Sequence, residues 1–252
     1  MKREPILNLP GVLTALIATL VVVHLALHSV SGETGLLWLE YFAFVPAKLS
    51  LLVAPTATLR ALAEYDADDL TQLVETSRFV WVTPLSYAFL HANWTHLGVN
   101  AVTLAAFGAP VARRLGDTRF LAFFAVTALG GAAAHYAVHP FDPGPVVGAS
   151  ASISGMIAAI ARFAFTPGGA LSDSSGRPGA AARPTLVELA SDRRAVIFLV
   201  SWIAANLIFG VLAPPAGEVG SIAWEAHMGG FLTGLTLFRW FDPTGRNASR
   251  RG

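Results

Sequence analysis

Long apolar segments constrain this chain more than any other feature. A helix needs about 20 mostly apolar residues to cross the hydrocarbon of a bilayer. Six segments approach that length: Gly11–Val30, Tyr87–Ala112, Phe120–His139, Val146–Phe165, Ala195–Leu212 and Ile222–Phe238. Only 13% of the residues are charged, against about 25% in a typical soluble domain. The sequence therefore predicts an all-α integral membrane protein, a bundle of six transmembrane helices in a lipid bilayer.

A further apolar stretch, residues 36–53, is interrupted by Glu40, Pro46 and Lys48. A spanning helix would have to bury both charges in hydrocarbon, which is costly. An interfacial or re-entrant segment would leave the charges in water and place aromatic residues at the headgroups. We therefore expect a membrane-associated first loop. The segment Gly11–Val30 is longer than a signal-peptide core and lacks a clear cleavage site, so we expect it to be retained.

Basic residues are distributed unevenly among the loops that six spans would create. One side receives most of them: Lys2, Arg3, Arg113, Arg114, Arg119, Arg177, Arg183, Arg193, Arg194, Arg239, Arg246, Arg250 and Arg251. The opposite loops 140–145 and 213–221 contain acidic residues but no Lys or Arg. The positive-inside rule then places both termini in the cytoplasm. A seventh span would invert the later loops and break this pattern.

This topology divides the chain into a small number of parts. They are a cytoplasmic N-terminus (1–10), a membrane domain (11–242) with an extracytoplasmic loop (31–80) and a flexible cytoplasmic loop (166–194), and a cytoplasmic tail (243–252). The formal net charge of +1 predicts no nucleic-acid partner. The absence of cysteine excludes disulfides, thiolate metal sites and a cysteine nucleophile. The sequence does not define an oligomeric state.

Polar residues inside apolar segments are functional candidates, because unpaired polar groups are expensive in hydrocarbon. His96 and Asn100 lie one helical turn apart on one face of the second segment. Ser150, preceded by Gly148, lies in the first turn of the fourth helix, where free backbone N–H groups favour negative charge. Each cluster alone could equally serve helix packing.

The sixth segment adds His227, followed on the same face by Gly230 and Gly234. These glycines would let a neighbouring helix approach closely enough for its serine to meet the imidazole. Six-span topology places all three clusters at similar depth near the extracytoplasmic face. A nucleophile, a base and hydrogen-bond donors are the parts of acyl-transfer chemistry. We expect no cofactor and no metal ion in this site.

The three motifs together resemble those of the rhomboid family of intramembrane serine proteases, bacterial members in particular. The second segment matches the family's pattern with His91, His96 and Asn100. The fourth matches its G-x-S motif with Gly148 and Ser150, and the sixth matches with His227, Gly230 and Gly234. The likeness covers roughly residues 80–242.

This resemblance implies a six-helix rhomboid-like fold and a serine–histidine dyad without a third carboxylate. Ser150 would be the nucleophile and His227 its base. The Ser150 N–H, His96 and Asn100 would hold the oxyanion, and His91 would be structural. The implied substrates are transmembrane segments of other membrane proteins, and the implied location is the bacterial inner membrane. Three positions depart from the usual pattern, since Ala151 replaces a glycine, Ser154 an aromatic residue, and Val82 the arginine of the family's Trp-Arg pair in the first loop.

Three other functions are alternatives to a protease. A catalytically inactive relative would bind transmembrane segments without cutting them. A membrane haem or metal protein could use the i,i+4 pairs His24/His28 and His135/His139, although interfacial or packing roles are favoured for these histidines. A small transporter would be expected to show an internal repeat, which the sequence lacks.

Overall fold

Helices make up the regular structure of this protein. The computed structural model describes residues 9–30, 32–165, 184–208, 210 and 223–243. Within these ranges the β pairing is limited to one isolated antiparallel bridge between Phe44 and Val146. Among the helices described, α1 (Gly11–Ser29) and α9 (Asp117–Val138) are long and apolar enough to cross a membrane individually. The all-α fold is confirmed, whereas the number of six spans stays a prediction.

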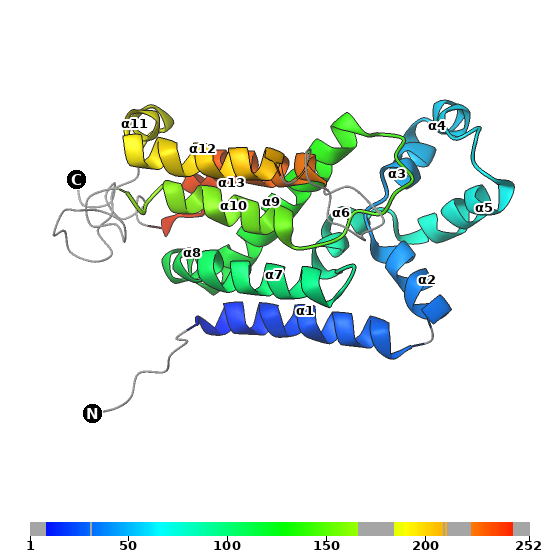
Figure 1. Cartoon of the computed structure of the whole chain (residues 1–252), viewed down its shortest axis with the longest axis horizontal. Coiled ribbons are helices and arrows are strands. Elements are labelled where there is room, and N and C mark those ends of the chain that lie inside the picture. Colours follow the sequence, from blue (N-terminus) through cyan, green and yellow to red (C-terminus); the bar gives the residue numbers. More distant parts are fainter. Residues whose placement is uncertain (1–8, 31, 166–183, 209, 211–222, 244–252) are drawn as a thin grey trace.

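The remaining long helices surround α9 and α10 (Ser150–Ala161). α13 (Trp224–Phe241) packs against both of them, and α12 (Arg193–Leu207) contacts α10 and α13. On the other side α1 contacts α7 (Trp94–Thr103), which continues through a π-helical turn, Leu104–Gly108, into α8 (Ala109–Leu115). Figure 1 shows these helices running side by side along the molecule. The short helix α11 (Leu186–Ser191) precedes α12 and begins with a Thr185–Glu188 capping box.

Small residues bring α13 directly onto α10. A side chain at Gly230 would overlap the carbonyl of Ala151, and one at Gly234 would overlap the backbone of Gly155. The sequence prediction that this glycine face admits a partner helix is therefore confirmed, and the partner is the helix that begins with Ser150.

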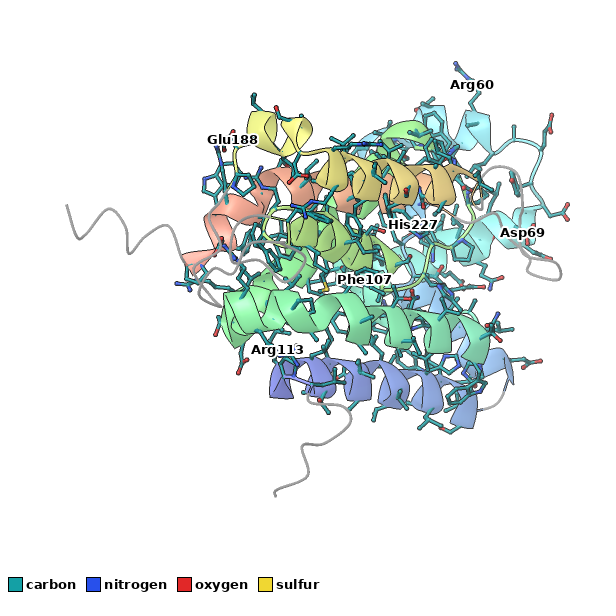
Figure 2. The ribbon with its side chains drawn as sticks, turned by 60° about the vertical axis from the view of Figure 1, so that its left-hand side comes forward. Arg60, Asp69, Phe107, Arg113, Glu188 and His227 are labelled. Carbon is teal, nitrogen blue, oxygen red and sulfur yellow. The ribbon has the colours of Figure 1, made fainter. Side chains whose placement is uncertain are left out.

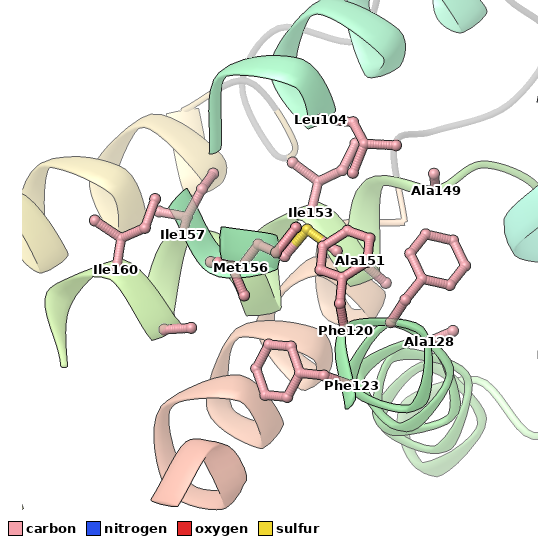
Figure 3. Close-up of a cluster of buried hydrophobic side chains, with 14 of the residues drawn as sticks. Leu104, Phe120, Phe123, Ala128, Ala149, Ala151, Ile153, Met156, Ile157 and Ile160 are labelled. Carbon is pink, nitrogen blue, oxygen red and sulfur yellow. The ribbon is translucent and has the colours of Figure 1, made fainter. Parts of the chain in front are cut away.

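A single apolar cluster fills the space where these helices meet. Figure 3 shows Phe120 of α9 beside Met156 of α10, in a cluster that also contains Phe123 of α9 and Leu104 of the π-helical turn. All four side chains are fully buried. The cluster fixes the relative positions of α9 and α10, and through them the position of Ser150.

Two helix boundaries differ from the sequence prediction. The predicted helix over residues 87–112 begins only at Trp94, because the Asn93 side chain accepts a hydrogen bond from the His96 N–H (2.8 Å) and caps a new helix there. The predicted helix over 146–165 begins at Ser150, because Val146 pairs with Phe44 as extended backbone. Apolar composition does not reveal either break.

The first loop forms short helices at one end of the molecule (Figure 1). They are α2 (Gly32–Phe42), α3 (Pro46–Val53), α4 (Pro55–Ala61), α5 (Ala67–Glu75), the 3-10 turn Thr76–Phe79, α6 (Thr83–Ser86) and the 3-10 turn Tyr87–Phe89. The apolar stretch 36–53 is thus two short helices separated before Pro46, neither long enough to span. Its association with a membrane stays a prediction.

The expectation that Lys48 stays in water is wrong. This residue is 2% exposed, and its Nζ donates a hydrogen bond to the Glu40 carbonyl oxygen (2.6 Å). The last turn of α2 supplies, through the Glu40 carbonyl, the polar partner that the sequence argument assigned to solvent. Nearby, the Ser50 hydroxyl donates to the Pro140 carbonyl oxygen (2.6 Å), and the Ala47 N–H donates to the Asp142 carbonyl oxygen (3.0 Å). The first loop is therefore fastened to the segment that leads into α10.

Candidate active site

The Ser150 hydroxyl and the His227 imidazole are in contact. Ser150 is the first residue of α10, and His227 lies in the first turn of α13. The distance from Ser150 Oγ to His227 Nε2 is 2.7 Å, a hydrogen bond of ordinary length. Figure 2 shows His227 between the end of the molecule that carries Arg113 and Glu188 and the end that carries Arg60 and Asp69. The close packing of α10 on α13 allows this approach.

The two neighbouring serines have other partners. The Ser152 hydroxyl donates to the Phe124 carbonyl oxygen (2.8 Å), and the Ser154 hydroxyl donates to the Ser150 carbonyl oxygen (2.7 Å). Both are buried within the bundle. Of the three serines in this turn, Ser150 is thus the one whose hydroxyl meets the imidazole.

A third residue, Asn206 of α12, touches the other side of the imidazole. Its Oδ1 lies 2.7 Å from His227 Nδ1, and its Nδ2 donates to the Trp224 carbonyl oxygen at 3.3 Å. The second bond assigns the amide orientation and leaves Oδ1 facing the ring. Because an amide oxygen only accepts, His227 Nδ1 must carry the proton in this bond. In a neutral ring Nε2 then has the free lone pair and accepts from Ser150.

Sequence reasoning missed Asn206. The residue lies within the apolar segment 195–212, so the rule that selected the other polar residues applies to it equally. Family motifs drew attention to three other segments, and Asn206 belongs to none of them.

Gly148 brings the loop before Ser150 against His96 and Asn100. Its φ of +119° is strained for residues with a side chain. A Cβ built at this position would lie 2.8 Å from His96 Nε2 and 3.3 Å from Asn100 Nδ2. The Gly148 N–H also donates to the Tyr87 carbonyl oxygen (2.9 Å), which holds the loop in place. The predicted oxyanion residues His96 and Asn100 therefore both lie against Gly148, two residues before Ser150 in the chain.

Two hydrogen-bond donors lie at this position. Within the described part of the chain, the buried Nδ2 of Asn100 has no hydrogen-bond partner. The N–H of Ser150, at the first position of α10, has no partner within its own helix. An unpaired buried donor is costly, so the Asn100 amide, together with an N–H at a helix N-terminus, suits a developing negative charge beside Ser150.

Three further sequence calls concern residues around this site. His91 is fully buried, and its ring meets the His96 ring edge-on at 5.1 Å; its expected structural role stays a prediction. Ala151 is buried, and its methyl group faces Gly131 of α9, whose missing side chain makes room for it. Ser154 offers His227 no aromatic ring, and its hydroxyl donates to the Ser150 carbonyl oxygen. Nearby, the rings of Phe231 and Trp202 stack on each other at 4.4 Å.

The two histidine pairs lie in different surroundings and do not form one site. His24 and His28 of α1 pack against Trp94 of α7. His135 and His139, at the end of α9, lie beside Glu225 of α13. A single site made from both pairs, as the haem or metal alternative supposed, is therefore not formed.

Long apolar helices that enclose a group of polar side chains define a helical integral membrane protein with a polar site in its interior. The family model for the rhomboid domain matches residues 78–241, well over half of the chain. The chain belongs to the rhomboid family, whose members are intramembrane proteases or inactive relatives of these enzymes. A search of curated proteins found no match.

Proposed function

We propose that this protein is an intramembrane serine endopeptidase that cuts transmembrane segments of other membrane proteins. The observation that carries the proposal is the 2.7 Å contact between Ser150 Oγ and His227 Nε2. An inactive relative has no need for a serine hydroxyl aligned on the lone pair of a partly buried imidazole.

In the proposed reaction Ser150 Oγ attacks the scissile carbonyl carbon while His227 Nε2 takes the hydroxyl proton. The resulting imidazolium donates from Nδ1 to Asn206 Oδ1, which keeps Nε2 directed at the reacting atoms. His227 then gives the proton to the leaving amine, and the acyl-enzyme forms. A water molecule, deprotonated by the same nitrogen, releases the second product.

The tetrahedral intermediate carries a negative oxygen that needs donors already in place. We assign this role to the Ser150 N–H, the Asn100 side-chain amide and the His96 ring. Their support is the contact of Gly148 with both side chains and the unpaired Asn100 Nδ2. His91, Gly230 and Gly234 would support the site through packing.

Membership of the family supports a substrate class rather than a particular substrate. We propose transmembrane segments that contain small or helix-breaking residues, because the backbone of a regular helix is closed to attack by its own hydrogen bonds. We further propose that the protein is a multi-pass protein of a bacterial inner membrane, with both termini in the cytoplasm and the site opening toward the other face.

The direct test is covalent labelling of the purified, detergent-solubilised protein with a fluorophosphonate probe, beside cleavage of a model transmembrane substrate. Wild type should react and cleave, whereas Ser150→Ala and His227→Ala should do neither. Ser154→Ala is the matched control, because it removes a neighbouring buried hydroxyl that is bonded to a carbonyl. Its labelling should resemble that of wild type.

The opposite result has an equally clear meaning. Folded wild-type protein that neither labels nor cleaves would refute the protease and favour an inactive relative that binds transmembrane segments. Labelling that survives Ser150→Ala would place the nucleophile elsewhere.

A further inference from the structure

Beside the proposed dyad lies a second polar cluster that peptide hydrolysis does not use. His135 and His139 are one turn apart at the end of α9, and Glu225 lies in the first turn of α13. The distance from His139 Nε2 to Glu225 Oε1 is 2.9 Å, and that from His135 Nδ1 to Glu225 Oε2 is 3.5 Å. One ligand atom from each residue lies within 4.8 Å of the others.

A hydrogen bond between His139 and Glu225 does not account for the whole cluster. His135 is 5% exposed, and within the described residues neither of its ring nitrogens has a hydrogen-bond partner of ordinary geometry. Buried nitrogens without partners are unfavourable. A cation bound between the carboxylate and the two rings would give His135 Nδ1 a partner.

The donor set suits a transition-metal ion. Two imidazoles and one carboxylate are a common zinc ligand set, with bonds of about 2.0–2.2 Å. Ligand atoms around a tetrahedral ion at that bond length are about 3.4 Å apart. The two histidine–glutamate distances, 2.9 and 3.5 Å, are close to that spacing, and the full set of three ligand atoms lies within 4.8 Å. Histidines at positions i and i+4 present both rings on one helical face.

A second carboxylate lies behind the buried imidazole, beyond hydrogen-bond distance. Asp142 Oδ2 lies 3.9 Å from His135 Nε2, on the side of the ring opposite Glu225. A carboxylate behind a ligand histidine commonly fixes the ring tautomer and increases its basicity. The side chain of His139 is 43% exposed, so the position of the ion can be reached from outside the bundle.

We propose that His135, His139 and Glu225 form a binding site for one divalent transition-metal ion, zinc by preference. The ion would join the end of α9 to the start of α13. Its ligand on α13, Glu225, is two residues before His227 in the chain. Sequence reasoning favoured packing or interfacial roles for these histidines and did not connect them with Glu225. The proposal does not depend on the proposed protease activity.

The test is a zinc titration of the full-length, detergent-solubilised protein, stripped with chelator and freed of any histidine tag. Competition with a chromophoric chelator should show one zinc ion per chain. Cobalt(II) should give visible d–d absorption of an ion with nitrogen and oxygen ligands. His139→Ala and Glu225→Gln should each weaken zinc binding by about tenfold or more.

His28→Ala is the matched control, since it removes an exposed histidine from the other i,i+4 pair. It should leave zinc affinity unchanged. Circular dichroism and thermal unfolding check that the variants fold, and His139→Ala replaces a half-exposed side chain that the fold can lose. Absence of stoichiometric binding, affinity unchanged in His139→Ala, or an equal loss in His28→Ala would each overturn the proposal.

Discussion

At the scale of single residues, the hydrogen-bond partners of His227 set its chemistry. Asn206 Oδ1 accepts from Nδ1, so the nitrogen that faces Ser150 is the basic one. An amide can hold the tautomer but adds no negative charge to stabilise the imidazolium. Asn206 is therefore a positioning residue, and its effect should be smaller than that of the base itself.

We expect Asn206→Ala to lower kcat by about 10- to 1,000-fold with little change in KM, because the imidazole loses the acceptor that orients it. Asn206→Asp retains an acceptor oxygen and should recover part of the loss. Steady-state cleavage of a transmembrane substrate measures both parameters. An unchanged kcat in folded Asn206→Ala would remove Asn206 from the mechanism.

A second prediction concerns Gly148. Replacement by Ala puts a methyl group against His96 and Asn100 and strains a backbone at φ +119°. Fluorophosphonate labelling should slow by at least about tenfold, since moving reacting groups by about 1 Å can lower a reaction rate by about 100-fold. Gly98→Ala is the control, because nothing lies within 4 Å of the added Cβ. Equal labelling of the two variants would show that the close approach at Gly148 is unimportant.

Sequence patterns identified most of this site but not its third member. Ser150, His227, His96 and Asn100 stand in short motifs, and the structure brings their surroundings together. Asn206 is a polar residue in an apolar segment and Glu225 is a first-turn acid, but neither stands in a motif with its partner. Their partners are 21 and 86 residues distant in the chain, and spacing along the sequence contains no information about such contacts.

At the scale of elements, the first loop depends on a buried lysine. Burial lowers the pKa of Lys48 to about 8, and the charge of Glu40 opposes that shift. The pKa in the unfolded chain is about 10.4. Because the folded pKa is the lower one, burying the charged lysine destabilises the folded state, and this destabilisation is complete below about pH 8. Folding stability should therefore increase as pH rises from about 8 to about 10.

This linkage predicts that the apparent unfolding temperature of wild type rises between about pH 7.5 and 9.5. Lys48→Met, which has no titrating group, should lack the Lys48-dependent part of that rise. The chain has no cysteine to titrate in the same range. Differential scanning fluorimetry in one detergent across the pH series gives the comparison. Parallel curves for the two proteins would show that Lys48 is hydrated in the folded state.

The first loop also marks a boundary of sequence prediction. Pro46 and the two charges correctly indicated that residues 36–53 do not form one long helix. The sequence could not show that the Glu40 carbonyl would bind Lys48. Every residue has a backbone carbonyl, and only the folded structure shows which one lies near the lysine. The starts of α7 and α10 were missed for a similar reason, since a cap and an isolated β bridge determine them.

At the scale of the whole molecule, the predicted topology separates two exposed positions. Glu64 belongs to the first loop and Ser191 ends α11. The positive-inside argument places Glu64 outside the cytoplasm and Ser191 within it. Because the chain has no cysteine, each site can be tested with a single introduced thiol.

A membrane-impermeant maleimide applied to intact cells should label Glu64→Cys but not Ser191→Cys. Both should label after the membrane is opened, which controls for accessibility. The reverse pattern would invert the topology, and labelling of both in intact cells would exclude a six-span arrangement with these two positions on opposite sides.

The location of His227 on α13, after all the other described helices, also has a consequence for biosynthesis. Ser150 and His227 are 77 residues apart. A ribosome that adds about 5–20 residues per second needs about 4–15 s to cover that distance. During this interval the nascent chain has a nucleophile without a base. Under the proposed mechanism the enzyme is therefore inert toward the translocation machinery and the neighbouring nascent chains until α13 has entered the membrane.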